Sequence, residues 1–274
     1  MNLPDPAQHT ALSADGTRIG FKTVGSGPVP LVVVHGALAT GKQWMSFARA
    51  MTGYSTCYVM DRWGRGGSGN RKNYSLEREV DDIEAVFEAA GPGACLLGHS
   101  SGAIYALEAA ARLSPSGLIL YEPPLHAFHG RFVEETWRRI RAAADAERFE
   151  EVLAIFLAGE SRLSREELDS LKTKPVWKEM TATAPQAVRE WDELIRIRPV
   201  PERYRTVATR TLLLAGTDAH PSFATQALQD TLPNAQTKQL AGEGHFAHVT
   251  SPGTVAEIVG TFLLGASPDE SDDG

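Results

Sequence analysis

Residues 94–102 read Ala-Cys-Leu-Leu-Gly-His-Ser-Ser-Gly, and this stretch decides the fold. A short apolar run ends in Gly98-His99-Ser100-Ser101-Gly102, and an alanine-rich, helix-favouring segment follows at once. This order indicates a buried strand, a tight turn that carries a serine, and a helix. Glycine is needed on both sides of the serine because a side chain there would collide with the neighbouring strand or helix. The pattern predicts that Ser100 Oγ is exposed above a sheet, in front of the free N–H groups of the helix.

Ser100 has two interpretations in this setting, a nucleophile or an ordinary Ser-Gly turn between two elements. The pattern alone does not separate them, because glycine and serine are common residues. The apolar strand before the turn and the helix after it favour the nucleophile.

The composition limits the class of protein. The chain has 274 residues, of which 42% are hydrophobic, which fits one large domain or a domain that carries an insertion. Its formal net charge of −7 argues against a nucleic-acid-binding surface. Four acidic residues crowd the last eight positions, residues 267–274, and we expect this tail to be disordered.

Cys57 and Cys95 both lie in apolar runs, and we expect them to be small core residues, not a disulfide or a metal site. The N-terminal residues lack the pattern of a signal peptide, and no apolar run has the length of a membrane span. We therefore expect a soluble cytoplasmic protein that binds no membrane, metal or organic cofactor, with a small molecule as its partner. The oligomeric state is left open.

Apolar runs without alternation recur along the chain, at residues 31–34, 56–60, 95–97, 118–121 and 211–215. Such runs are typical of parallel strands that are buried on both faces. Helical patterns lie between several of them, for example at residues 75–90, where Ser75 is a plausible N-cap. Residues 11–23 predict a hairpin with Asp15-Gly16 as its turn. We predict a doubly wound, mostly parallel α/β sheet.

The alternation of strand and helix stops between residues 126 and 205, which contain helical segments and no strand-like run. We interpret this region as a helical lid inserted between two sheet strands. Its aromatic residues are expected to pack mostly between helices, with one or two facing a substrate pocket: Trp137, Phe149, Phe156, Trp177 and Trp191. The predicted organisation is a core domain in two parts, a lid and a tail, at residues 1–125 and 206–266, 126–205 and 267–274.

A serine nucleophile needs a base within hydrogen-bond reach, and that base needs an orienting acid. His245 is the candidate base, because it lies in the glycine-rich loop Ala241–His245 after the last strand-like run, residues 237–240. The final helix follows, with Ser251-Pro252 at its start. His248, three residues further on, is expected to be a loop or helix-entry residue.

Two carboxylates are candidates for the acid, Glu122 in Tyr121-Glu122-Pro123 and Asp218 in Gly216-Thr217-Asp218. Both follow predicted strands, at the sheet edge where open α/β folds form their sites. Either could reach the same imidazole from adjacent strands.

An acyl-transfer site also needs two N–H donors for the developing oxyanion. We assign one to Ser101, the residue after the nucleophile, and the other to the loop His35-Gly36-Ala37-Leu38 after the first buried strand. Ala37 is our choice in that loop and Leu38 the second. His35 and His99 are expected to be a structural hydrogen-bonding residue and a turn residue.

These residues together resemble the α/β-hydrolase superfamily over nearly the whole chain outside the tail. The resemblance rests on the order and spacing of four motifs: His35-Gly36, the segment Asp61–Ser68, Gly98–Gly102 and Gly244-His245. It is closest to the lidded branch that holds esterases, dehalogenases and epoxide hydrolases. The last two groups use aspartate where this chain has Ser100, so the resemblance implies a serine esterase-like enzyme.

The resemblance also bears on the acid. In most members of the family the acid stands three residues after the glycine that ends the strand at residues 212–216, and that position here is Ala219. Asp218 stands one residue early. Some relatives place the acid after the preceding strand, where this chain has Glu122, and we therefore favour Glu122.

Gly64-Arg65-Gly66-Gly67-Ser68-Gly69 satisfies the G-x-G-x-x-G pattern of dinucleotide-binding proteins. That function requires the last glycine to open a helix, whereas a polar segment follows here. We expect this turn to lie beside the active site, with Asp61 as its anchor.

The predicted function is a serine hydrolase that cleaves a small or medium acyl compound through an acyl-enzyme on Ser100. A carboxylic ester is the favoured substrate. The same machinery would serve a thioester, a lactone or a C–C bond beside a carbonyl, because specificity resides in the lid. The alternative is a ligand-binding protein that keeps the fold without turnover.

Overall fold

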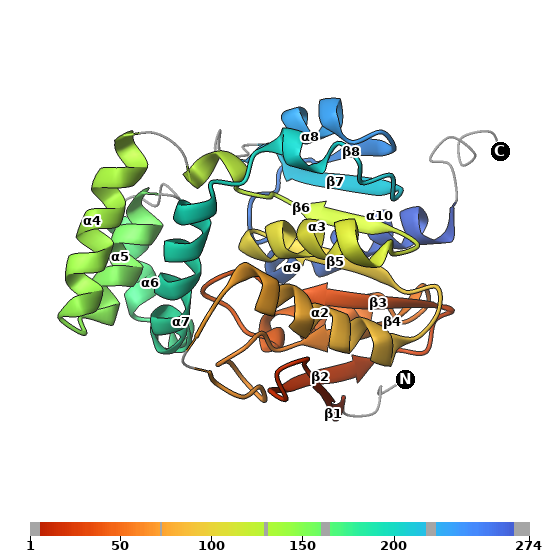
Figure 1. The fold of residues 1–274 in the computed structure, drawn as a ribbon, viewed down its shortest axis with the longest axis horizontal. Helices are drawn as coiled ribbons and strands as arrows, with labels where there is room; N and C mark the ends of the chain where they lie inside the picture. Colours follow the sequence, from red (N-terminus) through yellow and green to blue (C-terminus); the bar gives the residue numbers. More distant parts are fainter. Residues whose placement is uncertain (1–5, 72, 129–130, 160–164, 218–222, 266–274) are drawn as a thin grey trace.

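A computed structural model describes residues 6–71, 73–128, 131–159, 165–217 and 223–265, and within these residues the strands form one eight-stranded sheet (Figure 1). The strands are β1 Ala7–Leu12, β2 Arg18–Val24, β3 Val29–Val34, β4 Ser55–Met60, β5 Cys95–His99, β6 Leu118–Tyr121, β7 Thr211–Gly216 and β8 Ala235–Leu240. The acidic tail, residues 267–274, lies outside the described residues.

The sheet is parallel except at one edge. Its strand order is β1-β2-β4-β3-β5-β6-β7-β8, and only the pairs β1–β2 and β2–β4 are antiparallel. The antiparallel edge begins with the predicted hairpin, in which Gly16 has a φ of +81° and Thr17 N–H donates to Asp15 Oδ1 at 2.9 Å. The predicted mostly parallel α/β sheet is confirmed.

Each sheet face is covered by helices. On one face pack α2 Leu76–Ala90, α3 Ser101–Leu113 and α8 Thr225–Thr231; on the other pack η1 Gly41–Trp44 with α1 Met45–Ala50, α9 Ala247–Thr250 and α10 Pro252–Leu264. Strand β3 explains the unbroken apolar runs: Val32 and Val34 face the first layer, Leu31 and Val33 the second, and all four are fully buried. Cys57 and Cys95 are buried in this core, as predicted.

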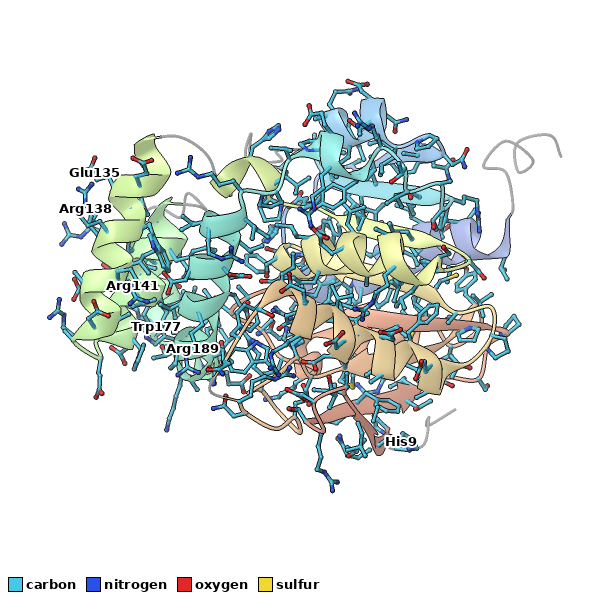
Figure 2. The ribbon with its side chains drawn as sticks, in the orientation of Figure 1. His9, Glu135, Arg138, Arg141, Trp177 and Arg189 are labelled. Carbon is cyan, nitrogen blue, oxygen red and sulfur yellow. The ribbon has the colours of Figure 1, made fainter. Side chains whose placement is uncertain are left out.

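In the described part of the chain between β6 and β7, four α-helices form a separate group beside the sheet, drawn in green and teal in Figure 1. They are α4 Arg131–Asp145, α5 Phe149–Gly159, α6 Arg165–Lys172 and α7 Pro175–Ile197, flanked by the short turns η2 Leu125–Phe128 and η3 Pro201–Tyr204. Helix α7, which carries Arg189 (Figure 2), contacts the core. The guanidinium carbon of Arg189 lies 5.8 Å from the ring centroid of Trp63, and Glu193 Oε1 accepts from Leu76 N–H. We call these four helices the insertion.

No helix within the described residues combines the length and the apolar character that crossing a bilayer requires.

The turn between β5 and α3 has the crowded geometry that its sequence predicts. A Cβ at Gly98 would lie 2.4 Å from Gly102 O, and a Cβ at Gly102 would lie 2.4 Å from Val34 O. Ser100 itself has φ of +54° and ψ of −129°, a conformation that costs about 1–3 kcal/mol and is found mostly at functional sites. His99 corrects one expectation, since it is the last residue of β5 and not part of the turn.

Gly102→Ala tests this crowding. Alanine is the best helix former, yet here we expect it to destabilise the protein by about 2 kcal/mol or more, because its methyl group would overlap the end of β3. The matched control is Gly253→Ala in α10, where a Cβ meets nothing within 4 Å. Chemical denaturation should find the control neutral or stabilised by up to about 1 kcal/mol. Equal effects of the two substitutions would refute the steric explanation.

Candidate active site

A cavity of about 770 Å³ lies between the sheet and the insertion, with Ser100 in its wall. Its polar end brings together residues from four loops that follow strands: Ala37 after β3, Ser100 after β5, Glu122 after β6 and His245 after β8. These strands are parallel, so their carboxyl ends meet at one edge of the sheet. The structure thus gathers most of the predicted site residues around one space.

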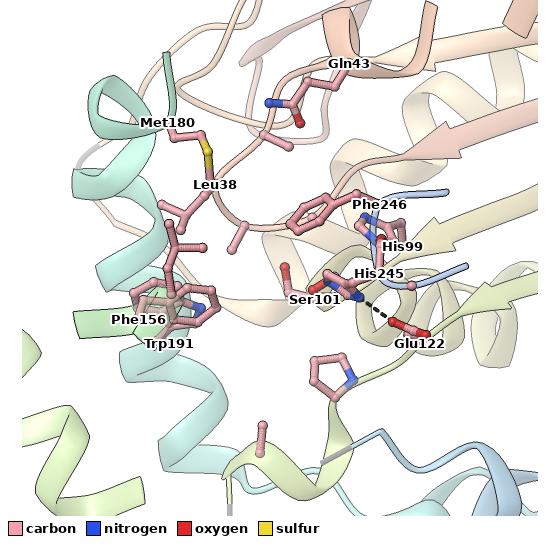
Figure 3. A pocket seen from close by; sticks show the side chains of 18 of the residues that line it. Leu38, Gln43, His99, Ser101, Glu122, Phe156, Met180, Trp191, His245 and Phe246 are labelled. Atoms are coloured by element: carbon pink, nitrogen blue, oxygen red, sulfur yellow. Dashed lines mark hydrogen bonds and ion pairs between the residues drawn. The ribbon is translucent and has the colours of Figure 1, made fainter. Parts of the chain in front are cut away.

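Glu122 and His245 form a hydrogen-bonded pair at this end of the cavity (Figure 3). His245 Nδ1 lies 2.5 Å from Glu122 Oε2, and Glu122 Oε1 accepts from Gly216 N–H at 2.7 Å. The Glu122 side chain is 1% exposed and that of His245 21%, so the pair is shielded on the carboxylate side only. A proton held on Nδ1 leaves Nε2 of His245 free to accept another. The other candidate acid, Asp218, lies outside the described residues.

The backbone around His245 is fixed by two side chains that our sequence reasoning did not use. Tyr121 Oη donates to Gly244 O and accepts from Ala247 N–H at 3.2 Å. The ring of His99 donates from Nε2 to His245 O at 2.9 Å. Tyr121 could have been suspected, because a hydroxyl at the end of a buried strand needs a partner.

His99 and His248 form a buried layer behind His245. The His248 ring stacks on Trp44 at 4.2 Å between centroids and lies 4.6 Å from the His99 ring. Burial lowers the pKa of His248 to about 3 and the pKa of His99 well below its usual value. Both rings therefore stay neutral and place no positive charge beside His245. The expectation for His248 as a helix-entry residue holds, because it lies in α9, but the residue is fully packed.

The loop of residues 35–38 passes directly in front of Ser100. A Cβ on Gly36 would lie 3.1 Å from Ser100 Cβ, and Ala37 and Leu38 line the cavity. On the other side of Ser100, Ser101 opens helix α3 and is buried. The residues predicted to supply oxyanion donors therefore flank the serine.

The far end of the cavity is apolar and is built by the insertion. Trp137 of α4, Phe156 of α5 and Trp191 of α7 line it together with Ile140 and Met180. Phe156 stacks on Trp191 at 4.3 Å and an interplanar angle of 10°. Figure 3 shows Phe156, Trp191 and Met180 across the cavity from the Glu122–His245 pair. Three of the five aromatic residues named from the sequence thus line the cavity, where one or two were expected.

The glycine-rich segment at residues 64–69 is a turn fastened to Asp61, as predicted. Asp61 accepts from Gly41 N–H through Oδ1 and from Gly67 N–H through Oδ2, each at 2.9 Å. Helix α2 begins only at Leu76, so this pattern lacks the helix that a dinucleotide site requires.

Among the described residues, no group of three or more His, Cys, Asp or Glu side chains could hold a metal ion.

Comparisons with known proteins agree with this architecture. The model of the alpha/beta hydrolase family matches residues 31–258. N-formylmaleamate deformylase from Pseudomonas putida is 34% identical over 119 residues, which cover 42% of this chain and 44% of that enzyme. The matched stretch thus spans less than half the length of that relative.

Solved structures of other proteins share the fold over nearly the whole chain, and two of them serve as examples. An alpha/beta hydrolase from Sphaerobacter thermophilus is 30% identical, with a TM-score of 0.82 over 93% of this chain and 100% of that one. An esterase from Rhodococcus sp. is 22% identical, with a TM-score of 0.73 over 95% and 99% of the two chains. The chain belongs to the alpha/beta hydrolase family.

Proposed function

We propose that this protein is a serine hydrolase that cleaves a small or medium acyl compound, with a carboxylic ester as the favoured substrate. The observation that carries the proposal is the Glu122–His245 pair, 2.5 Å apart, in the wall of the cavity that also holds the strained Ser100. A nucleophile, a base and an orienting acid are the three groups that acyl transfer needs.

In the proposed reaction Ser100 Oγ attacks the carbonyl carbon while His245 Nε2 takes the hydroxyl proton. The carbonyl oxygen becomes an oxyanion, which the N–H groups of Ser101 and Ala37 bind. When the tetrahedral intermediate collapses, the C–O bond to the alcohol breaks and His245 gives the alcohol its proton. Water, deprotonated by His245, then attacks the acyl-enzyme and releases the acid with Ser100 restored.

Glu122 holds the imidazole in the tautomer that this sequence of steps requires. Its second oxygen is occupied by Gly216 N–H, so the carboxylate is fixed from both sides. As His245 gains a proton in the first step, the buried negative charge of Glu122 stabilises the imidazolium.

The insertion supplies the substrate pocket in this proposal and acts as the lid. Its cavity face consists of aromatic and aliphatic side chains and the hydroxyl residue Thr136, and Lys174, just before α7, lines the cavity and is solvent-exposed. If the acyl group of the substrate carried a carboxylate, Lys174 would be the one lysine or arginine among the described lining residues that could pair with it. This lining favours an uncharged acyl group. The relative from Pseudomonas putida is an N-formylmaleamate deformylase. We therefore add N-acyl compounds to thioesters, lactones and C–C bonds as alternative substrates.

The nucleophile is tested with a fluorophosphonate probe, which reacts with activated serines and needs no knowledge of the substrate. We expect intact mass spectrometry to show a single stoichiometric adduct on the wild type and none on Ser100→Ala, because Ser100 lines the same cavity as the proposed base His245. An adduct on Ser100→Ala, or none on the folded wild type, would refute the proposal and favour a ligand-binding protein.

The acid is tested by Glu122→Gln. The glutamine oxygen can still accept from Gly216 N–H, but the glutamine NH2 group would then face His245 Nδ1. A donor at that position favours the tautomer with the proton on Nε2, which cannot accept the proton of Ser100. We expect kcat to fall by about 10³–10⁴-fold. Asp218→Asn is the control and should leave kcat within about two-fold. A large loss in Asp218→Asn with none in Glu122→Gln would exchange the two assignments, and full activity in both would remove the acid from the proposal.

The pocket is tested by Phe156→Ala, measured on p-nitrophenyl esters of increasing acyl length. We expect kcat/KM to fall by about 10-fold or more for octanoate and to change little for acetate, because only the long chain reaches the far end. Phe149→Ala is the matched control, a half-buried phenylalanine of the same helix that does not line this cavity. Equal losses for both esters would contradict this use of the pocket.

A further inference from the structure

Four charged side chains are completely buried between the core and the insertion. Arg62 and Arg65 follow β4, Glu79 belongs to α2 and Glu190 to α7, and each of these side chains is 0% exposed. Arg62 holds Glu79 through Nε and Nη2, at 3.0 Å each. Glu190 Oε1 lies 2.9 Å from Arg62 Nη2 and 2.5 Å from Arg65 Nη1. The two positive and two negative charges balance, but removing four charges from water carries a desolvation cost that a cluster of apolar residues would avoid.

One further nitrogen of each arginine, Arg62 Nη1 and Arg65 Nη2, binds the loop in front of Ser100. Arg65 Nη2 donates to Ala37 O at 2.5 Å. Arg62 Nη1 donates to His35 O at 3.3 Å and Gly36 O at 3.4 Å. Three consecutive carbonyl groups of the loop are thus held by two buried guanidinium groups.

The imidazole of His35 adds a further bond. Its Nε2 accepts from Arg62 N–H at 3.1 Å, so the ring proton lies on Nδ1 and is donated to Gly36 O at 2.8 Å. Burial and the two arginines lower the pKa of His35 well below its usual value, which keeps the ring neutral. His35 is therefore a structural hydrogen-bonding residue, as the sequence predicts.

These carbonyl bonds fix the direction of the N–H groups that matter for catalysis. In a planar trans peptide the C=O and the following N–H point in opposite directions. The bond from Arg65 to Ala37 O therefore sets where Leu38 N–H points, and the bonds to Gly36 O set where Ala37 N–H points. Ala37 and Leu38 are the two residues considered for the second oxyanion donor.

Glu190 connects this arrangement to the substrate pocket. It belongs to α7, where the next residue, Trp191, lines the apolar end of the cavity. A shift of α7 would therefore move Glu190 and release or reorient Arg65. The same helix thus lines the proposed substrate pocket and carries the carboxylate that holds Arg65.

We propose that Arg65, held by Glu190 of the insertion, is a positioning residue: it fixes the peptide between Ala37 and Leu38 and thereby holds in place Ala37, whose own N–H is the proposed oxyanion donor. This proposal rests on the proposed serine hydrolase function. Arg65 does not touch substrate; it acts through Ala37 O. Its loss is expected to weaken transition-state stabilisation and leave the binding of the substrate largely unchanged.

The test measures the second-order rate of Ser100 modification by the fluorophosphonate, whose phosphoryl oxygen occupies the oxyanion site, together with kcat and KM on a p-nitrophenyl ester. For Arg65→Met we expect both the modification rate and kcat to fall by about 10²-fold, comparable to the loss of an oxyanion donor, with KM within about three-fold. Glu190→Gln should lower both rates by about 10-fold. Arg65→Lys should rescue only part of the loss, because one ammonium cannot bind Ala37 O and Glu190 in the planar geometry of arginine.

Asp82→Asn is the matched control. Asp82 is also a buried carboxylate paired with an arginine, Arg71, at 2.5 Å, but the pair has no bond to the oxyanion loop. We expect this variant to lose stability in denaturation while its modification rate and kcat stay within about two-fold of the wild type.

The possible failures are distinguishable. If the wild type is not modified at all, the proposed function fails, and this inference fails with it. If the wild type reacts and the folded Glu190→Gln and Arg65→Lys variants react at the wild-type rate, the serine hydrolase stands and the positioning role is overturned. The same holds if Asp82→Asn slows the reaction as much as Glu190→Gln, because the effect would then follow general loss of stability. These conservative variants decide the matter even if Arg65→Met does not fold.

Discussion

The close approach of helix α3 to the end of strand β3 is the constraint from which the site follows. Gly102 lies so near that a Cβ would stand 2.4 Å from Val34 O and 2.5 Å from His35 O. This contact presses the start of α3 against the loop at residues 35–38 and leaves Ser100 between them with a strained backbone, at φ +54° and ψ −129°. The same packing that strains the serine therefore also brings two stretches of backbone N–H groups to its sides.

The carboxylate shows how two adjacent strands can supply one function. Glu122 follows β6, yet its side chain accepts from the N–H of Gly216, the last residue of β7. Its own N–H donates to Leu214 O, and its φ of +48° turns the side chain toward β7. The carboxylate thus reaches the end of β7 from the neighbouring strand. This geometry explains why an acid after either strand can pair with the same imidazole.

The sequence was informative where a local pattern has a single structural solution. The unbroken apolar runs, the glycines around Ser100 and the Asp15-Gly16 turn predicted the sheet, the crowded turn between β5 and α3, and the hairpin. The hydrogen bonds of Tyr121 and His99 and the buried ion pairs could not be predicted from the sequence, because the partners lie far away in the chain. Glu190 pairs with arginines more than 120 positions earlier. From the sequence alone, a glutamate in a helical segment is expected to be exposed to solvent.

The insertion is connected to the candidate site in two ways. It lines the cavity through Trp191, and it contributes the buried carboxylate of Glu190. An insertion that only covered the site would need apolar contacts with the core, and hydrophobic residues of similar volume would serve as well as ion pairs or better. Here α7 instead carries a carboxylate to two arginines that hold the carbonyls of the loop before Ser100. Backbone carbonyls can be held only by donors, and buried donors with positive charge need a buried negative partner. The charge on Glu190 is thus a consequence of orienting that loop from outside the sheet. Changes in the insertion that reshape the pocket around Trp191 would therefore also alter the geometry at the serine.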